Sequence, residues 1–261
     1  MGNVYREAIE APSDRIIVAL DDMTWGEATQ VIYETKEFIG LGKANSLAQR
    51  NGWKPAVDGL QDAGVRTMAD TKFHDIPKTV ELQVEAVTQT KASLITVHAS
   101  GGQKMLEHAV TGRDRAKETL QRQYKGMLRD ELIGGLLGIT VLTSIDKEQC
   151  ESIYGDEPEK KVIQFARTAL EAGLDGIVCS GKELEAIRSD DSLSELITVV
   201  PGITPEWAKK ADDQKRVVTP REAIQNGADY LVIGRAITQP PEGVSRTEAA
   251  QRINQEIAEA L

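Results

Sequence analysis

The sequence has 261 residues with 41 acidic and 31 basic side chains, so its formal net charge is −10. This negative balance argues against non-specific nucleic-acid binding, which needs a basic surface, but a locally basic pocket can still hold a small anionic ligand. The two cysteines, Cys150 and Cys179, cannot build a disulfide framework. Residues 1–14 lack the apolar core of a signal peptide, and no stretch is apolar and long enough to span a membrane. We therefore expect a cytoplasmic protein.

Short apolar runs alternate with longer amphipathic segments along the whole chain. In the first half, this pattern predicts strands at residues 15–20, 38–43, 65–69 and 93–98. Helices are predicted at residues 24–36, 46–63, 79–91 and 104–128. We expect Thr24 to cap the first helix, and the second to break near Gly52 and Pro55.

The second half continues the alternation. Strands are predicted at residues 136–142, 176–179, 196–200 and 229–233, and helices at residues 160–172, 219–226 and 246–260. Eight strand–helix units predict an α/β fold, a single (β/α)8 TIM barrel spanning residues 1–261, with residues 1–14 as a short N-terminal extension. An open, doubly wound sheet is the alternative.

Polar residues are concentrated just after the predicted strands. They are Asp21, Lys43, Asp70, Lys72, His98, Ser144, Ser180, Gly202 and Arg235. The active site of a parallel barrel lies at the carboxyl ends of its strands, so these side chains are candidates for one shared site.

The segment from residue 70 to 79 carries the densest chemistry. Asp70 and Lys72 lie two residues apart and project to the same side of an extended chain, and Asp75 follows before Ile76 and Pro77 turn the chain. Such a charge run is more often a solvated loop. The buried-type strand before it, the spacing and the rigid turn favour a functional site.

Asp-x-Lys-x-x-Asp-Ile-Pro-x-Thr, from Asp70 to Thr79, resembles the signature of the orotidine 5′-phosphate decarboxylase family, and the resemblance extends from Ile16 to Ile237. It implies decarboxylation of a nucleotide, orotidine 5′-phosphate, to UMP and CO2 in pyrimidine biosynthesis, without cofactor or metal. It also implies a homodimer with shared active sites, in which Asp75 and Thr79 reach the partner's site, and it makes Ile76 a substrate-binding residue.

The resemblance also implies roles for single residues. Lys72 would donate the proton, Asp70 would face the leaving carboxylate, and Lys43 would hydrogen-bond the ribose and steady the carboxylates. The substrate would be bound by Asp21 at the ribose, Ser144 at the pyrimidine ring, Gln214 between base and phosphate, and Pro201, Gly202, Gly234 and Arg235 at the phosphate. Glycines after strands seven and eight suit phosphate binding in barrels, and arginine suits its charge.

Simpler interpretations stand beside several of these roles. Lys43 could extend to water, Asp21 could cap a helix, and Thr143 rather than Ser144 could contact the base. We assign His98 no catalytic role.

Two other functions compete with decarboxylation of the nucleotide. A Mg-dependent sugar-phosphate decarboxylase or aldolase of the same suprafamily would carry an acidic metal ligand near strand two, where this chain has Gly42-Lys43-Ala44-Asn45. A non-catalytic nucleotide-phosphate-binding barrel would lack a charge of the constellation, and none is missing. We expect no nucleic-acid or membrane partner.

Overall fold

Eight short parallel strands form a closed barrel in the computed structural model, which describes residues 3–125, 132–208 and 218–261. The strands are β1 (Ile16–Ala19), β2 (Leu41–Ala44), β3 (Arg66–Phe73), β4 (Leu94–His98), β5 (Gly135–Ile139), β6 (Gly176–Val178), β7 (Ile197–Val200) and β8 (Tyr230–Ile233). Each strand pairs with the next in the sequence, and β8 pairs with β1. This closure confirms the predicted barrel and excludes the doubly wound sheet.

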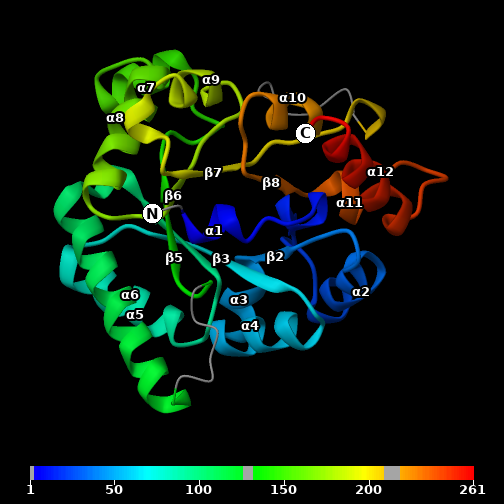
Figure 1. The fold of residues 1–261 in the computed structure, drawn as a ribbon, viewed down its shortest axis with the longest axis horizontal. Helices are drawn as coiled ribbons and strands as arrows, with labels where there is room; N and C mark the ends of the chain where they lie inside the picture. Colours follow the sequence, from blue (N-terminus) through cyan, green and yellow to red (C-terminus); the bar gives the residue numbers. More distant parts are fainter. Residues whose placement is uncertain (1–2, 126–131, 209–217) are drawn as a thin grey trace.

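Helices surround the strands (Figure 1). They are α2 (Trp25–Thr35), α3 (Ser46–Asn51), α4 (Trp53–Asp62), α5 (Pro77–Thr88), α6 (Gln103–Tyr124), α7 (Lys147–Tyr154), α8 (Pro158–Glu171), α9 (Leu184–Arg188), α10 (Pro220–Gln225), α11 (Arg235–Thr238) and α12 (Arg246–Ala258). Within the described ranges, no helix combines the length and apolar character needed to cross a membrane.

Local sequence signals explain several helix ends. Thr24 caps α2 by accepting a hydrogen bond from the Glu27 amide, as expected. Gly52, with φ of 90°, separates α3 from α4, which confirms the predicted break, whereas Pro55 lies inside the first turn of α4.

Some predicted boundaries are wrong. The strand predicted at residues 38–43 begins at Leu41, because the Phe38 amide bonds the Thr35 carbonyl in the turn that ends α2. Helix α5 begins at Pro77 rather than at Thr79, since proline lacks the amide hydrogen that a first helical residue leaves unpaired. Helix α6 ends at Tyr124, and residues 126–128 of the helix predicted at 104–128 lie outside the described residues.

Two apolar clusters divide the core. Side chains that point outward from the strands pack against the surrounding helices, as Ile16 and Val18 do. Those that point inward, such as Ile17, Leu41 and Met68, fill the barrel interior. This alternation along each strand leaves the residues at the strand ends facing a common mouth.

A short helix, α1 (Val4–Glu7), lies over the centre of the ring of strands in Figure 1. Tyr5 is only 2% exposed; its hydroxyl donates to the Ile133 carbonyl, and its own carbonyl accepts from the Tyr230 hydroxyl. The segment before β1 therefore packs against the amino-terminal end of the barrel and leaves the opposite end to the site.

Candidate active site

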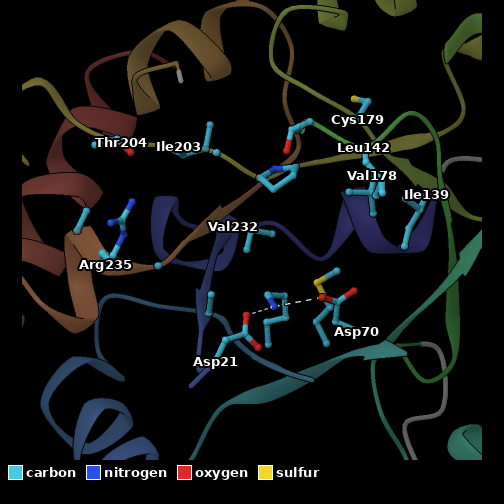
Figure 2. Close-up of a pocket in the computed structure, with 18 of the residues that line it drawn as sticks. Asp21, Asp70, Ile139, Leu142, Val178, Cys179, Ile203, Thr204, Val232 and Arg235 are labelled. Carbon is cyan, nitrogen blue, oxygen red and sulfur yellow. Dashed lines mark hydrogen bonds and ion pairs between the residues drawn. The ribbon is translucent and has the colours of Figure 1, made fainter. Parts of the chain in front are cut away.

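A cavity of about 380 Å³ opens at the carboxyl ends of the strands. Most of the candidate residues line it: Asp21, Lys43, Asp70, Lys72, Pro201, Gly202, Gly234 and Arg235. Ile139, Leu142 and Val178 form an apolar wall near Asp70 (Figure 2). The closed sheet thus brings together side chains that are more than 200 residues apart in the sequence.

Four alternating charges form a connected row on one side of the cavity. The Lys43 ammonium lies 2.5 Å from Asp21 Oδ2 and 3.2 Å from Asp70 Oδ2 (Figure 2). The Lys72 ammonium donates to the same oxygen of Asp70. Lys43 is 8% exposed and Asp70 is 7% exposed, so Lys43 does not extend to water and Asp70 is not part of a solvated loop.

The two central charges of this row, Asp70 and Lys43, are stabilised by their neighbours. Burial by itself would raise the pKa of Asp70, but Lys43 and Lys72 outweigh it and hold the pKa below its usual range. Burial would likewise lower the pKa of Lys43, yet Asp70 and Asp21 raise it. Asp70 is therefore an anion and Lys43 a cation at neutral pH. Thr24 caps α2, so Asp21 is not the helix cap and can pair with Lys43.

The end of β3 departs from the simple extended strand that was expected. The register between β3 and β4 shifts between Ala69 and Phe73, and Lys72 has a positive φ of 53°. A non-glycine residue in this region is uncommon, and such backbone is often found at functional sites. Asp70 and Lys72 still converge, because their side chains are held by the ion pair.

Arg235 lies at the opposite end of the cavity from Asp70 (Figure 2). It begins α11 directly after Gly234, and Pro201 and Gly202 follow β7 beside it. Gly202 has φ of 75°, a conformation that glycine adopts without strain. A ligand with an anionic end at Arg235 would thus present its other end to Lys72.

The structure separates three predicted residues from this cavity within the single chain. Asp75 and Ile76 are exposed, Ile76 by 67%, and Thr79 lies in the first turn of α5. Within the described part of the chain, none of the three belongs to the cavity lining.

The loop after β5 carries the two alternative contacts to the base. Thr143 lines the cavity, whereas Ser144 is exposed and outside the lining found among the described residues. Gln214 lies outside the described residues. His98 packs against His74 with ring centroids 5.3 Å apart, and burial, followed by His74 and Lys72, lowers its pKa.

Sequence reasoning overlooked Thr96, whose hydroxyl donates to Asp70 Oδ1 at 3.0 Å. A signal was present, since Thr96 follows Leu94 by two residues and Leu94 points into the barrel. A polar residue at an inward-facing strand position near the mouth identifies a candidate neighbour of the site. Thr204 and Gln239 also line the cavity, and both come from loops without a recognisable pattern.

Comparisons with known proteins agree with this geometry. Residues 14–251 match the model of the orotidine 5′-phosphate decarboxylase / HUMPS family. A relative from Heliobacterium modesticaldum, named orotidine 5′-phosphate decarboxylase, is 38% identical over 95% of this chain and 97% of its own length. One of the same name from Moorella thermoacetica is 38% identical over 90% of each chain. The crystal structure of orotidine 5′-phosphate decarboxylase from Lactobacillus acidophilus is 26% identical, covers 93% of this chain and 98% of its own, and superimposes with a TM-score of 0.73.

Proposed function

Since this chain belongs to the orotidine 5′-phosphate decarboxylase / HUMPS family, we propose that it converts orotidine 5′-phosphate to UMP and CO2 in pyrimidine biosynthesis. The observation that carries the proposal is the row Asp21–Lys43–Asp70–Lys72 on one side of a cavity with Arg235 at its far end. An anionic nucleotide with a second, reacting anionic group matches that distribution of charge.

Lys72 acts at the reacting carbon. The bond between ring carbon six and the carboxylate breaks, its electron pair stays on the carbon, and CO2 leaves. The Lys72 ammonium stabilises this developing negative charge and then transfers a proton to the carbon, after which the amine regains a proton from solvent.

Asp70 faces the carboxylate that leaves. Its pKa is lowered because Lys43 and Lys72 outweigh the effect of burial, so Asp70 stays charged and disfavours a second anion nearby. The repulsion disappears as the substrate carboxylate becomes neutral CO2, and the apolar wall of Ile139 and Val178 suits that product.

The remaining residues hold the nucleotide. Asp21 accepts a hydrogen bond from a ribose hydroxyl, and Lys43 donates one to the ribose. Thr143 approaches the base from the loop after β5. Arg235 and the amides of Gly202 and Gly234 bind the phosphate, with Gln214 bridging phosphate and base. Binding energy from the phosphate is thereby available to the reacting end of the substrate.

We propose that the reaction uses no metal or other cofactor. The Lys43 ammonium lies between Asp21 and Asp70, in the position that a divalent cation would need in order to use both carboxylates. The side-chain amide nitrogen of Asn45 donates a hydrogen bond to the Asp70 backbone carbonyl at 2.6 Å. These contacts favour the decarboxylase over the Mg-dependent suprafamily enzymes.

The test is the loss of orotidine 5′-phosphate absorbance with purified protein in EDTA. We expect full activity in chelator and no gain from added Mg²⁺. Activity that disappears with EDTA and returns with Mg²⁺ favours the metal-dependent alternative. Binding of UMP without any turnover of orotidine 5′-phosphate favours the non-catalytic barrel.

We further propose that two chains form a homodimer with shared active sites. Asp75 and Ile76 are exposed beside the mouth of their own barrel, and Leu82 on α5, the helix that follows them, is 52% exposed. A two-fold axis near this surface would place Asp75 and Thr79 of each chain in the site of the other.

Mixed dimers test the shared site. Lys72→Ala and Asp75→Asn homodimers should each be nearly inactive. When the two variants are unfolded and refolded together in equal amounts, half of the dimers are mixed, and each has one intact site. Activity should return to about a quarter of the wild-type level, by counting of sites. Mixed dimers that form and stay inactive show that Asp75 acts in its own chain.

A further inference from the structure

Thr96 makes side-chain and backbone contacts with three consecutive residues at the end of β3. Its side chain is completely buried on β4. The hydroxyl donates to Asp70 Oδ1 at 3.0 Å and accepts from the Lys72 amide at 2.9 Å. The Thr96 carbonyl accepts from the Thr71 hydroxyl at 2.5 Å. Thr96 therefore holds the segment from Asp70 to Lys72, which carries both members of the ion pair.

The Lys72 amide needs this partner because the strand ladder shifts there. Ala69 pairs with Ile95 and Phe73 pairs with Val97, so three residues of β3 stand opposite one residue of β4. Lys72, at φ of 53°, lies in this bulge. The Thr96 hydroxyl supplies the hydrogen bond that would otherwise be missing at a backbone conformation that is unfavourable for lysine.

The same hydroxyl also fixes Asp70. Since it accepts a hydrogen bond from the Lys72 amide, its own hydrogen is directed to Asp70 Oδ1. The other carboxylate oxygen, Oδ2, accepts from both Lys43 and Lys72. Both oxygens of Asp70 are therefore bound, and the plane of the carboxylate is held relative to the backbone of Lys72.

We propose that Thr96 is a positioning residue for the decarboxylation: it fixes the Asp70 carboxylate and the strained Lys72 backbone in one arrangement before substrate binds. The inference rests on the proposed function. Thr96 acts through Asp70 and Lys72, so its effect belongs to the chemical step rather than to binding of phosphate and ribose at the far end of the cavity.

The decisive variants are Thr96→Val, which keeps the shape and removes the hydroxyl, and Thr96→Ser, which keeps the hydroxyl. We expect Thr96→Val to lower kcat by about 10-fold to 100-fold, as loss of a hydrogen bond to a charged group allows. Thr96→Ser should stay within about fivefold of wild type, since it retains both hydrogen bonds. The Kd for UMP, measured by calorimetry, should change less than about twofold in either variant.

Thr198 offers a matched control at the other end of the barrel. It is also completely buried on a strand, accepts from Arg188 at 2.9 Å and lies 3.4 Å from Asp229 Oδ2. We expect both Thr198→Val and Thr96→Val to lower the melting temperature, and Thr198→Val to leave kcat unchanged. Loss of kcat in both variants would show a general effect of buried hydroxyls on stability and would overturn the proposal.

Two other outcomes also overturn it. One is a kcat for Thr96→Val within about twofold of wild type, and the other is an equal loss of kcat in Thr96→Ser and Thr96→Val. If Thr96→Val does not fold, Thr96→Ala replaces it in the comparison with Thr96→Ser, and the same outcomes decide. A wild-type protein without decarboxylase activity refutes the proposed function itself, whereas an active wild type with an equally active Thr96→Val refutes only the positioning role.

Discussion

Two buried aspartates at opposite ends of the barrel have nearly the same surroundings and opposite uses. Asp70 at the carboxyl end and Asp229 at the amino end each have a side chain that is 9% exposed. Asp70 pairs with Lys43 and Lys72 and accepts from Thr96. Asp229 pairs with two arginines and also contacts the hydroxyl of a buried strand threonine.

The cations make the difference. Arg6 donates to both oxygens of Asp229 at 2.8 and 3.1 Å, and Arg188 adds a bond of 2.7 Å. These planar forks cannot give up a proton and hold the carboxylate in one geometry. At Asp70 the cations are lysines, and the side chain of Lys72 is 42% exposed to the cavity. The same carboxylate with two cations is therefore a fixed structural network at one end, whereas at the other end it belongs to the site that we propose to be reactive.

The largest expected effect comes from removing the reactive cation. Lys72→Ala should lower kcat by at least about 100-fold, because acid catalysis at the carbon is lost. The melting temperature should change little, since Lys43 still pairs with Asp70 in this variant. A variant that retains more than about a hundredth of the wild-type rate contradicts the role of Lys72 as proton donor.

Removing the charge at the other end should act on stability alone. Asp229→Asn leaves Arg6 and Arg188 without their anion and should lower the free energy of unfolding in urea by about 3 kcal/mol. The kcat of the folded protein should be unchanged. Asp58→Asn, which breaks the exposed ion pair with Lys54, is the control and should lower the free energy of unfolding by less than about 1 kcal/mol. A loss of kcat in Asp229→Asn would mean that the two ends are coupled.

A smaller effect should appear in the pH dependence of stability. Lys43 and Lys72 outweigh burial and hold the pKa of Asp70 below its usual range, so its contribution to stability is present above the ordinary aspartate pKa and is lost as the pH falls through the lowered value. The difference in unfolding free energy between wild type and Asp70→Asn should therefore be constant near neutrality and shrink below about pH 4. Urea unfolding from pH 2 to 7 measures it, with the exposed Asp22→Asn as control. A difference that grows toward acid pH has the wrong sign.

The smallest effect tests the arginine geometry directly. Arg6→Lys keeps the charge beside Asp229 but loses the fork that also donates to the Ser194 and Leu196 carbonyls. We expect a loss of about 1 kcal/mol in unfolding free energy, the size of one hydrogen bond, with unchanged kcat. An unaltered urea midpoint would indicate that charge alone, rather than the fork, stabilises this end.

The sequence was sufficient to predict those candidate site residues that lie near the ends of strands. Asp70 and Lys72 are close in the sequence. Lys43 is the penultimate residue of β2, and Arg235 follows β8 by two residues, so the alternation of strands and helices places them at the mouth. The choice between Thr143 and Ser144 depended on a loop that no periodicity describes.

Other features were beyond the reach of local patterns. The network around Asp229 joins Arg6 to a residue 223 positions later, and residues 1–14 gave no sign of it. The strand predicted from residue 38 begins only at Leu41, because the residues before it complete the turn after α2. Asp75 and Thr79 lie outside the cavity lining found among the described residues, and the mixed-dimer experiment tests the proposal that they act in the site of a second chain.

The helix α1 has a consequence for the order of folding. Its carbonyl at Tyr5 binds the Tyr230 hydroxyl, 225 residues later in the chain. During synthesis α1 therefore has to wait for β8, the last strand of the barrel, before it can dock. Contacts between residues so far apart in the sequence form late and slowly. We therefore expect the Tyr5 side chain to stay exposed to solvent until β8 has paired with β1. Docking of the amino terminus thus marks the moment at which the barrel is complete.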